Sequence, residues 1–520
     1  MGLETLSEGD DAATPDDPLG KRPRLRFFRA PRIPVVKQAV DLLVADRPAT
    51  ADTIVAAPTP LQPIDLTDDA RVAEVLDLAV RVGEVVLASG TGVNDTTTQV
   101  RFIAATYGLS RCDIDVTYDA IRIWADRGPQ LPPASTMRVV KYRSLDFTRL
   151  AAVDRLTRRI RNEVVSPEDA RAQLDAITSA PHPYHRWIAT FGWSLLAASI
   201  AALLGGGWLV AAVSFGTTLA IDRANRVLNR YGLPFFFQHV VGGAIAATPA
   251  LLLATLAATV HINVDPTLII AAGITVLLSG LQLVGAVQDG ITGAPITATA
   301  RMLEVLMMTG GIIAGIALAL RVGELAGATV PPVYLTSGRD ITDLPIKIAA
   351  GAVAALTFAL ACYAERRALA AAALGGAAGT ICFLLVQHLG FGPVISSAVA
   401  ATLVGLAGGL MARRSLTPPL VVAVAGITPL LPGLKVYRGL YALLNDELLI
   451  GANQVLAAVG VGCALAAGVT LGEWIDRTVR RPRITSRFGS IRRPVIVRRR
   501  RPPRHPLRRD TSRSRETHRE

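Results

Sequence analysis

Four ionisable residues lie inside or beside long apolar segments, where a charge is costly and is therefore a candidate for function. They are Asp222, Asp289, Arg301 and Glu304. Burial favours the neutral form of a carboxyl group, so a carboxylate in such surroundings can take up and release a proton. Arg301 and Glu304 are three residues apart on one predicted helix face and could also simply pair with each other. The pattern predicts a proton-coupling set without deciding which carboxylate carries the proton.

A nine-residue segment occurs twice in nearly the same form. Residues 272–280 read Ala-Gly-Ile-Thr-Val-Leu-Leu-Ser-Gly, and residues 425–433 read Ala-Gly-Ile-Thr-Pro-Leu-Leu-Pro-Gly. Glycine and proline interrupt helical hydrogen bonds, and the freed groups are tolerated at membrane depth only if they line a polar cavity or are buried in protein. Freed N–H groups can bind a carboxylate, and freed carbonyls an ammonium or an ion. Close helix packing against glycine is the alternative interpretation.

These breaks and the polar residues near them form the predicted substrate-binding set. It comprises Thr275, Gly280, Gln282, Thr428, Pro429, Pro432, Gly433 and Asn453. The sequence contains no Walker A lysine, no Gly-x-Ser-x-Gly elbow and no His-Glu-x-x-His motif, which argues against an enzyme and against transport driven by ATP hydrolysis on this chain. No catalytic residue, cofactor or metal site is predicted.

Long apolar helices must position these residues. The chain is 51% hydrophobic with a mean hydropathy of +0.40, and its apolar residues run almost continuously from 187 to 475. A bilayer crossing takes about 20 apolar residues. The sequence therefore predicts ten spans, five within 187–321 and five within 344–475. Their expected positions are 187–204, 206–221, 236–260, 266–288, 296–320, 344–363, 367–389, 391–412, 418–434 and 449–474.

The repeated segments fall in the fourth and ninth spans, so the predicted repeat is five spans long. A copy with an odd number of spans enters the membrane upside down, which gives the inverted repeat of many secondary transporters. Arginines gather in loops on one predicted side, at 223–230, 366–367 and 413–414. By the positive-inside rule both termini are then cytoplasmic.

Two flanking parts differ in composition from the apolar region. Residues 1–66 are rich in Pro, Asp, Ala and Thr and are expected to form a disordered leader. Residues 476–520 form a basic tail, without an acidic residue from Arg477 to Arg509. Directly after a membrane helix, such a tail favours a cytoplasmic anchor that contacts anionic lipid over a nucleic-acid site.

Residues 67–180 are expected to form a small soluble α+β domain. Helices are predicted at 68–87, 95–107, 145–162 and 166–177, and strands around 114–118, 121–124 and 137–142. Ser89–Asn94 contains two glycines but lacks a full phosphate-loop motif, so nucleotide binding there is disfavoured. His182 and His185 lack an evident third metal ligand and favour a linker at the membrane interface. The four scattered cysteines are expected to be packing residues.

Several segments together resemble the threonine/serine exporter family. They are Val82–Gly90, Thr96–Val100, Tyr107–Leu109, Leu150–Leu156, Ser166–Ile177, Gln282–Asp289 with Gly293 and Arg301, and Pro429–Gly433 with Tyr437. The resemblance covers about residues 70–475, and the order of the motifs carries it. The first repeat has Leu278-Ser-Gly280 where a Pro-Gly pair is expected, which puts equal roles for the two halves in doubt.

The resemblance implies a plasma-membrane secondary transporter that exports L-threonine and L-serine by proton antiport. Two alternatives stay open. One is export of another small solute such as a dicarboxylate, and the other is a membrane-anchored sensor whose soluble domain binds a ligand. The expected partners are the amino-acid substrate, protons and lipid, and homo-oligomer assembly is left open.

Overall fold

The protein is described by a computed structural model. It describes residues 63–141, 143, 145–260, 266–277, 280–328, 343–415, 418–444 and 446–480. The predicted leader and nearly all of the basic tail lie outside these residues. The described chain has an N-terminal α+β region, residues 63–180, and a helical region, residues 186–480.

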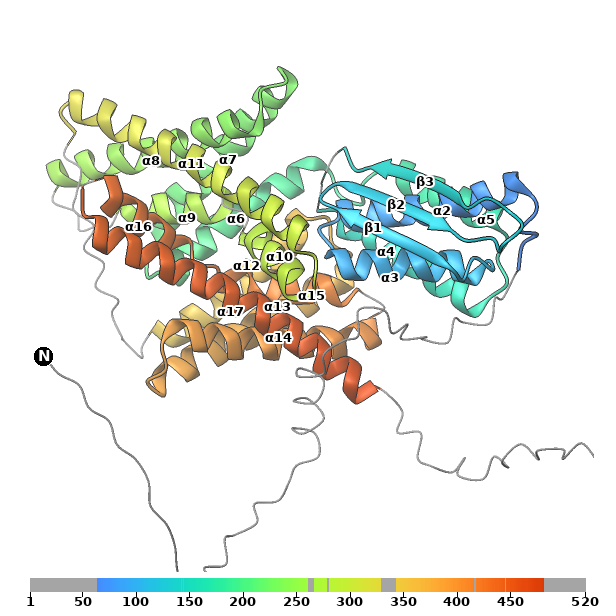
Figure 1. Cartoon of the computed structure of the whole chain (residues 1–520). Coiled ribbons are helices and arrows are strands. Elements are labelled where there is room, and N and C mark those ends of the chain that lie inside the picture. Colours follow the sequence, from blue (N-terminus) through green and yellow to red (C-terminus); the bar gives the residue numbers. More distant parts are fainter. Residues whose placement is uncertain are drawn as a thin grey trace, which may run out of the picture. The chain divides into compact units, whose positions relative to one another are not determined.

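The N-terminal region is a three-stranded antiparallel sheet with helices on one face (Figure 1). Its elements are α2 (Asp69–Ala88), α3 (Val93–Thr106), β1 (Cys112–Thr117), β2 (Ala120–Ala125), β3 (Ala134–Val139), α4 (Phe147–Asn162) and α5 (Pro167–Ser179). Side-chain caps from Asp68, Asp146 and Ser166 begin α2, α4 and α5, because a side-chain oxygen satisfies otherwise free amides of the first turn. The predicted order of elements is confirmed.

Several predicted boundaries in this region are wrong by two or three residues, and two of them have a clear physical reason. The third strand ends at Val139 instead of reaching residue 142, because it must match β2, where Ala120 pairs with Val139 and Ala125 with Ala134. The second helix begins at Val93, two residues before the predicted Asp95, because Gly92 supplies its extended N-cap backbone.

A two-residue turn, Tyr118-Asp119, joins β1 to β2, and Tyr118 has a φ of 55°. Few non-glycine residues adopt this backbone, and they do so where contacts hold them there. The Tyr118 N–H donates to the Thr297 hydroxyl of the helical region at 2.9 Å. The turn is thus fixed by a contact outside its own region.

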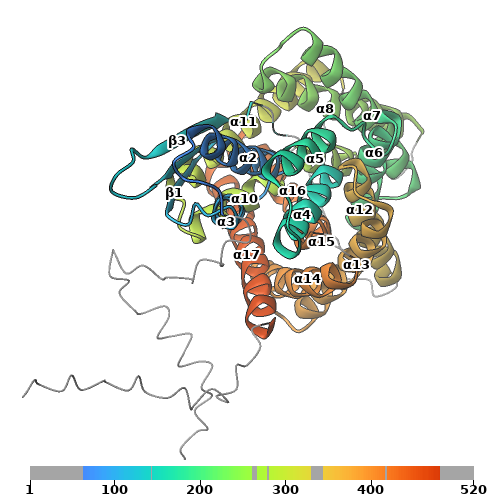
Figure 2. The same ribbon diagram turned by 90° about the vertical axis from the view of Figure 1, so that its right-hand side faces the viewer.

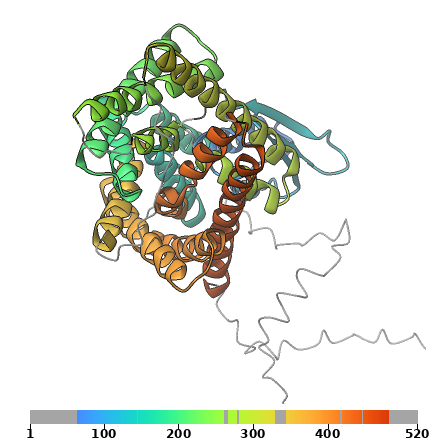
Figure 3. The ribbon, with the colours of Figure 1, turned by 90° about the vertical axis from the view of Figure 1, so that its left-hand side faces the viewer.

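The helical region follows the predicted order of apolar segments. Its elements are α6 (Arg186–Leu203), α7 (Trp208–Arg230), α8 (Phe235–Val260), α9 (Thr267–Leu277), α10 (Gly280–Ile291), α11 (Pro295–Leu325), α12 (Leu344–Ala361), α13 (Arg366–His388), α14 (Pro393–Ser415), α15 (Pro419–Ile427), the 3₁₀ turn η2 (Thr428–Leu430), α16 (Gly433–Leu444) and α17 (Leu448–Arg480). Figures 2 and 3 show the shorter helices α9, α15 and α16 inside a ring of longer ones.

Seven helices in the described part of the chain are long and apolar enough to cross a membrane, and the number is eight if α9 and α10, bent by 50° between them, form one span. Two of the ten predicted spans are not among them. Helix α7 ends in a charged run from Asp222 to Arg230, and α15 with η2 is short.

The two halves of the helical region pack by the same pairs of elements. Helix α6 packs on α7 as α12 packs on α13, and α8 packs on α11 as α14 packs on α17. Glycines permit the closest approaches: a Cβ at Gly243 or Gly315 would overlap backbone of the facing helix, and so would one at Gly468 or Gly472. For these glycines, helix packing is the correct interpretation.

Cys112 in β1 should react very slowly in the folded protein. It is buried, its thiol donates to the Leu109 carbonyl at 3.2 Å, and burial raises its pKa to about 11. At pH 8 its thiolate fraction is then about a hundredfold below that of an ordinary thiol. We therefore replace Cys362, Cys382 and Cys463 by alanine, so that Cys112 is the one remaining thiol. Maleimide should then label Cys112 about a hundredfold more slowly in native protein than in urea. Equal rates would contradict the buried position.

Candidate functional site

Asp289 and Arg301 form a buried ion pair between α10 and α11. The Asp289 side chain is fully buried, and its Oδ2 accepts from Arg301 Nη1. Its other oxygen, Oδ1, accepts from the Val93 backbone N–H at 2.9 Å. One carboxylate therefore joins two helices of the helical region to the N-terminus of α3.

This contact explains the glycine-containing segment Ser89–Asn94. The N-terminus of a helix attracts anions, because its first amides lack internal partners. Here the anion is the protein's own Asp289, and a Cβ at Gly92 would come within 3.2 Å of Asp289 Oδ1. The loop has the geometry of an anion site, but a carboxylate of the helical region already fills it.

Glu304 pairs with the N-terminal region, and the alternative that it pairs with Arg301 is wrong. Its Oε2 accepts from Arg143 Nη1 and from the Tyr118 hydroxyl, each at 3.2 Å. Arg143 also donates to the Tyr118 carbonyl at 3.1 Å and lies over the Tyr118 ring. Burial, and then the charge of Glu304, raise the pKa of Tyr118. Arg301 pairs instead with Asp289. Glu304 therefore contacts the hairpin turn and Arg143.

A cavity of about 380 Å³ adjoins these groups, and we call it the junction cavity. Its polar lining includes Gln282, Arg301 and Glu304 from the helical region and Arg143 from the N-terminal region. Small-molecule sites typically have volumes of about 300–1,000 Å³ and a few convergent polar groups. Three residues of the two predicted sets thus meet at one cavity.

The repeated segments contact each other. Gly433, at the start of α16, lies so close to Thr275 of α9 that a Cβ there would overlap the threonine side chain. Thr428, Pro429 and Pro432 are buried at the equivalent break, where α15 gives way to η2 and then to extended backbone at Leu431. Both predicted hydroxyls donate within their own helical turn, Thr275 to Ala271 at 2.7 Å and Thr428 to Val424 at 3.0 Å. Each keeps its lone pairs for a further partner.

The remaining predicted residues lie apart from this contact. Gly280 begins α10, next to residues 278 and 279, which lie outside the described residues. Asn453 is exposed on α17. Asp222 accepts from the Thr190 hydroxyl at 2.8 Å and pairs with Arg226 of its own helix at 2.9 Å.

A second contact joins the start of α4 to the turn between α12 and α13. Phe147 N–H donates to the Cys362 carbonyl at 3.0 Å, and Arg155 pairs with Glu365 at 2.7 Å. His182 stacks on Tyr363 and lies 3.0 Å from Asp146. His182 thus contacts both sides of this junction. Within the described residues no cluster of His, Cys, Asp or Glu could hold a metal ion.

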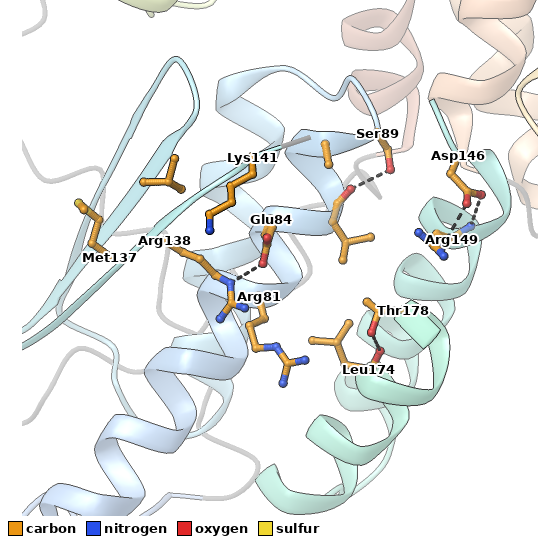
Figure 4. Close-up of a pocket in the computed structure, with 13 residues that line it drawn as sticks. Arg81, Glu84, Ser89, Met137, Arg138, Lys141, Asp146, Arg149, Leu174 and Thr178 are labelled. Carbon is orange, nitrogen blue, oxygen red and sulfur yellow. Dashed lines mark hydrogen bonds and ion pairs between the residues drawn. The ribbon is translucent and has the colours of Figure 1, made fainter. Parts of the chain in front are cut away.

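The N-terminal region contains a separate pocket of about 640 Å³ among α2, β3, α4 and α5 (Figure 4). Four basic residues line it: Arg81, Arg138, Lys141 and Arg149. Arg138 bonds to Glu84, and Arg149 lies 3.4 Å from Asp146 Oδ2 (Figure 4). Arg81 also pairs with Asp175 and Arg138 with Asp77, so a small anion in this pocket would compete with carboxylates for the arginines.

Sequence reasoning missed Arg143, Tyr118 and the Val93 amide. All three lie in the N-terminal region, whereas every predicted site residue lies in an apolar segment or beside one. The glycines of Ser89–Asn94 were the one signal at this position, but nucleotide binding there was disfavoured because the full phosphate-loop motif is missing.

Two family models match the chain in succession. One, described as a threonine/serine exporter, matches residues 77–323, and the second, "Threonine/Serine exporter, ThrE", matches residues 347–475. No solved structure matches the chain.

Among its relatives are two that match over most of their length. A "Threonine/serine exporter" of Corynebacterium glutamicum is 44% identical over 84% of this chain and 90% of its own. A "Probable threonine/serine exporter" of Mycobacterium tuberculosis is 39% identical over 79% of this chain and 78% of its own. The predicted family is confirmed, and with it a multi-pass membrane transporter in place of an enzyme: the chain belongs to the threonine/serine exporter family.

Proposed function

We propose that this protein exports L-threonine and L-serine from the cytoplasm across the plasma membrane by proton antiport. The names of its relatives support the substrates. The proposed topology has ten spans in two inverted halves, with both termini cytoplasmic. The matching helix pairs of the two halves, and the break between the two family matches at residues 323–347, support that division.

The contact between Gly433 and Thr275 is the observation on which the transport mechanism rests. It joins the two repeated segments, and an interrupted helix at membrane depth can offer backbone groups to a polar solute. A rearrangement of one half against the other would shift this contact and open the path alternately to each side. Thr275, Thr428, Pro429, Pro432 and Gly433 are the proposed substrate path, and Gly280 and Asn453 are retained as proposed members.

Glu304 is the best placed of the proposed proton carriers. Its side chain is 25% exposed and lines the junction cavity, whereas Asp289 is fully buried and held by Arg301. Asp222 is held by Arg226. A proton carrier must exchange with water as well as with the substrate path, and of the three Glu304 alone lines the junction cavity.

Glu304→Gln should abolish export of radiolabelled threonine driven by a pH gradient, because an amide cannot take up the proton. The measurement is threonine uptake into everted vesicles, with and without a protonophore. Glu324→Gln is the matched control, because Glu324 lies on the same helix in an exposed pair with Arg321. Proton-coupled export that persists at the normal rate in Glu304→Gln would exclude Glu304 as the carrier. Lack of threonine transport by the unaltered protein would overturn the proposed function itself.

A second function, ligand sensing, is favoured by the basic pocket of the N-terminal region. Its arginines and lysine suit a small anionic ligand. If sensing is the function, Lys141→Ala should abolish the binding of that ligand to the full chain, and threonine efflux from cells should not depend on the protein. Efflux that depends on the protein and is unaffected by Lys141→Ala would favour the exporter.

A further inference from the structure

The junction cavity is built by both regions of the chain. The N-terminal region contributes Leu87, Ala88, Gly90, Arg143 and Leu145, and the helical region contributes Trp193, Gln282, Gly285, Arg301, Glu304, Ala361 and Cys362. Without the N-terminal region the cavity would lose one wall and one of its two arginines. A site at this position therefore depends on both regions.

The two arginines of the cavity differ in their partners and in how deeply they are buried. The Arg301 side chain is buried and forms an ion pair with Asp289. Arg143 and Glu304 form a looser pair, with side chains 26% and 25% exposed and 3.2 Å between Nη1 and Oε2. A partly exposed pair of this kind contributes little to stability, so a ligand can replace it at little cost.

We propose that the junction cavity binds the zwitterionic head of a small amino acid, with Arg143 as the ligand of the α-carboxylate and Glu304 as the ligand of the α-ammonium. This inference rests on the proposed export function and specifies where substrate enters. A guanidinium binds a carboxylate through two parallel hydrogen bonds. The Gln282 amide can bond a side-chain hydroxyl, and Leu145 and Trp193 supply apolar surface for its methyl group.

The arrangement selects against a dicarboxylate. A second carboxylate in place of the ammonium would face Glu304, and like charges at such a distance repel. The same geometry gives the N-terminal region a role in transport. When substrate separates Arg143 from Glu304, it also displaces the Tyr118 hydroxyl from Glu304. Substrate binding would therefore weaken the contact between the hairpin turn and α11.

The test measures threonine binding and export kinetics for the full chain. We expect Arg143→Gln to raise the Kd of the purified protein for threonine at least tenfold and to raise the KM of export similarly. Arg155→Gln is the matched control, because Arg155 pairs with Glu365 across the same two regions without lining the cavity. It should change the Kd and the KM less than twofold.

A second variant keeps every charge. A Cβ at Gly285 would lie 3.7 Å from Arg301 Nη1, its nearest neighbour. Gly285→Val therefore fills cavity space without a backbone clash. It should also weaken threonine binding at least tenfold, whereas Gly290→Val, on the same helix away from the cavity, should not.

The outcomes separate this inference from the proposed function. Export of threonine by the unaltered protein, with an unchanged Kd in Arg143→Gln and Gly285→Val, would overturn the cavity assignment alone. Equal losses in Arg143→Gln and Arg155→Gln, with normal binding in Gly285→Val, would show that Arg143 only docks the N-terminal region. If the unaltered protein neither bound nor exported threonine, the proposed function would fail.

Discussion

Neutralising either member of the buried Asp289–Arg301 pair should destabilise the protein by about 3–5 kcal/mol, because the partner is left as an uncompensated buried charge. Asp289→Asn keeps an oxygen that can accept from the Val93 amide, so the loss reports the missing charge. The double variant Asp289→Asn with Arg301→Gln should recover most of the stability, since it leaves no uncompensated charge in the protein interior. Thermal unfolding of the purified protein measures the stability of the two single variants and of the double variant.

Export should be lost in both single variants and should stay lost in the double variant, because the pair joins α10 and α11 to the N-terminal region. Asp222→Asn is the matched control for stability. Its pair with Arg226 is partly exposed, so it should cost less than about 1 kcal/mol. Normal export in both single variants would remove the pair from the mechanism. A double variant as unstable as the worse single variant would show that shape, and not charge, is what this site requires.

Gly433→Ala should reduce threonine export more than tenfold. The added methyl group would overlap the Thr275 side chain at the contact of the two repeated segments. Overpacking of this kind typically costs about 1–3 kcal/mol, and here the strain would fall on the interrupted helices themselves. Efflux of radiolabelled threonine from cells, normalised to the amount of protein in the membrane, measures the effect.

Two further variants make this result specific. Gly216→Ala places a methyl group on helix α7, where nothing lies within 4 Å, and should leave export unchanged. Thr275→Gly in the Gly433→Ala background removes the overlapping side chain and should restore part of the export. Equal activity of Gly433→Ala and Gly216→Ala would mean that the close contact is not needed for transport.

The fold was largely predictable because hydrophobicity is a local property of the sequence. Runs of apolar residues mark α6, α8 and α11–α14 within a few residues, since each run must be long enough to cross a bilayer. The nonapeptide repeat predicted the two interrupted segments, because glycine and proline interrupt helical hydrogen bonds. Helix α7 was less clear, because its last turns carry the charges Asp222–Arg230.

The candidate site was only partly predictable. Asp289, Arg301 and Glu304 were predicted because charges are rare in apolar segments. Their partners were not, because the choice between Asp289 and Glu304 as the partner of Arg301 depends on how α10 and α11 pack. Arg143 and Tyr118 come from a loop and a hairpin turn more than 150 residues earlier in the chain, and no local pattern connects positions so far apart.

The central claim is that the two interrupted segments line the path of the substrate, and the accessibility of Thr428 tests it most directly. The measurement is labelling of Thr428→Cys by a membrane-impermeant thiol reagent, in protein whose four native cysteines are replaced, added to right-side-out and to everted vesicles. Thr428 is buried at the second break, so a rigid protein would protect it from both sides. The account predicts labelling from each side, slowed by threonine. Protection from both sides during active threonine transport would contradict it.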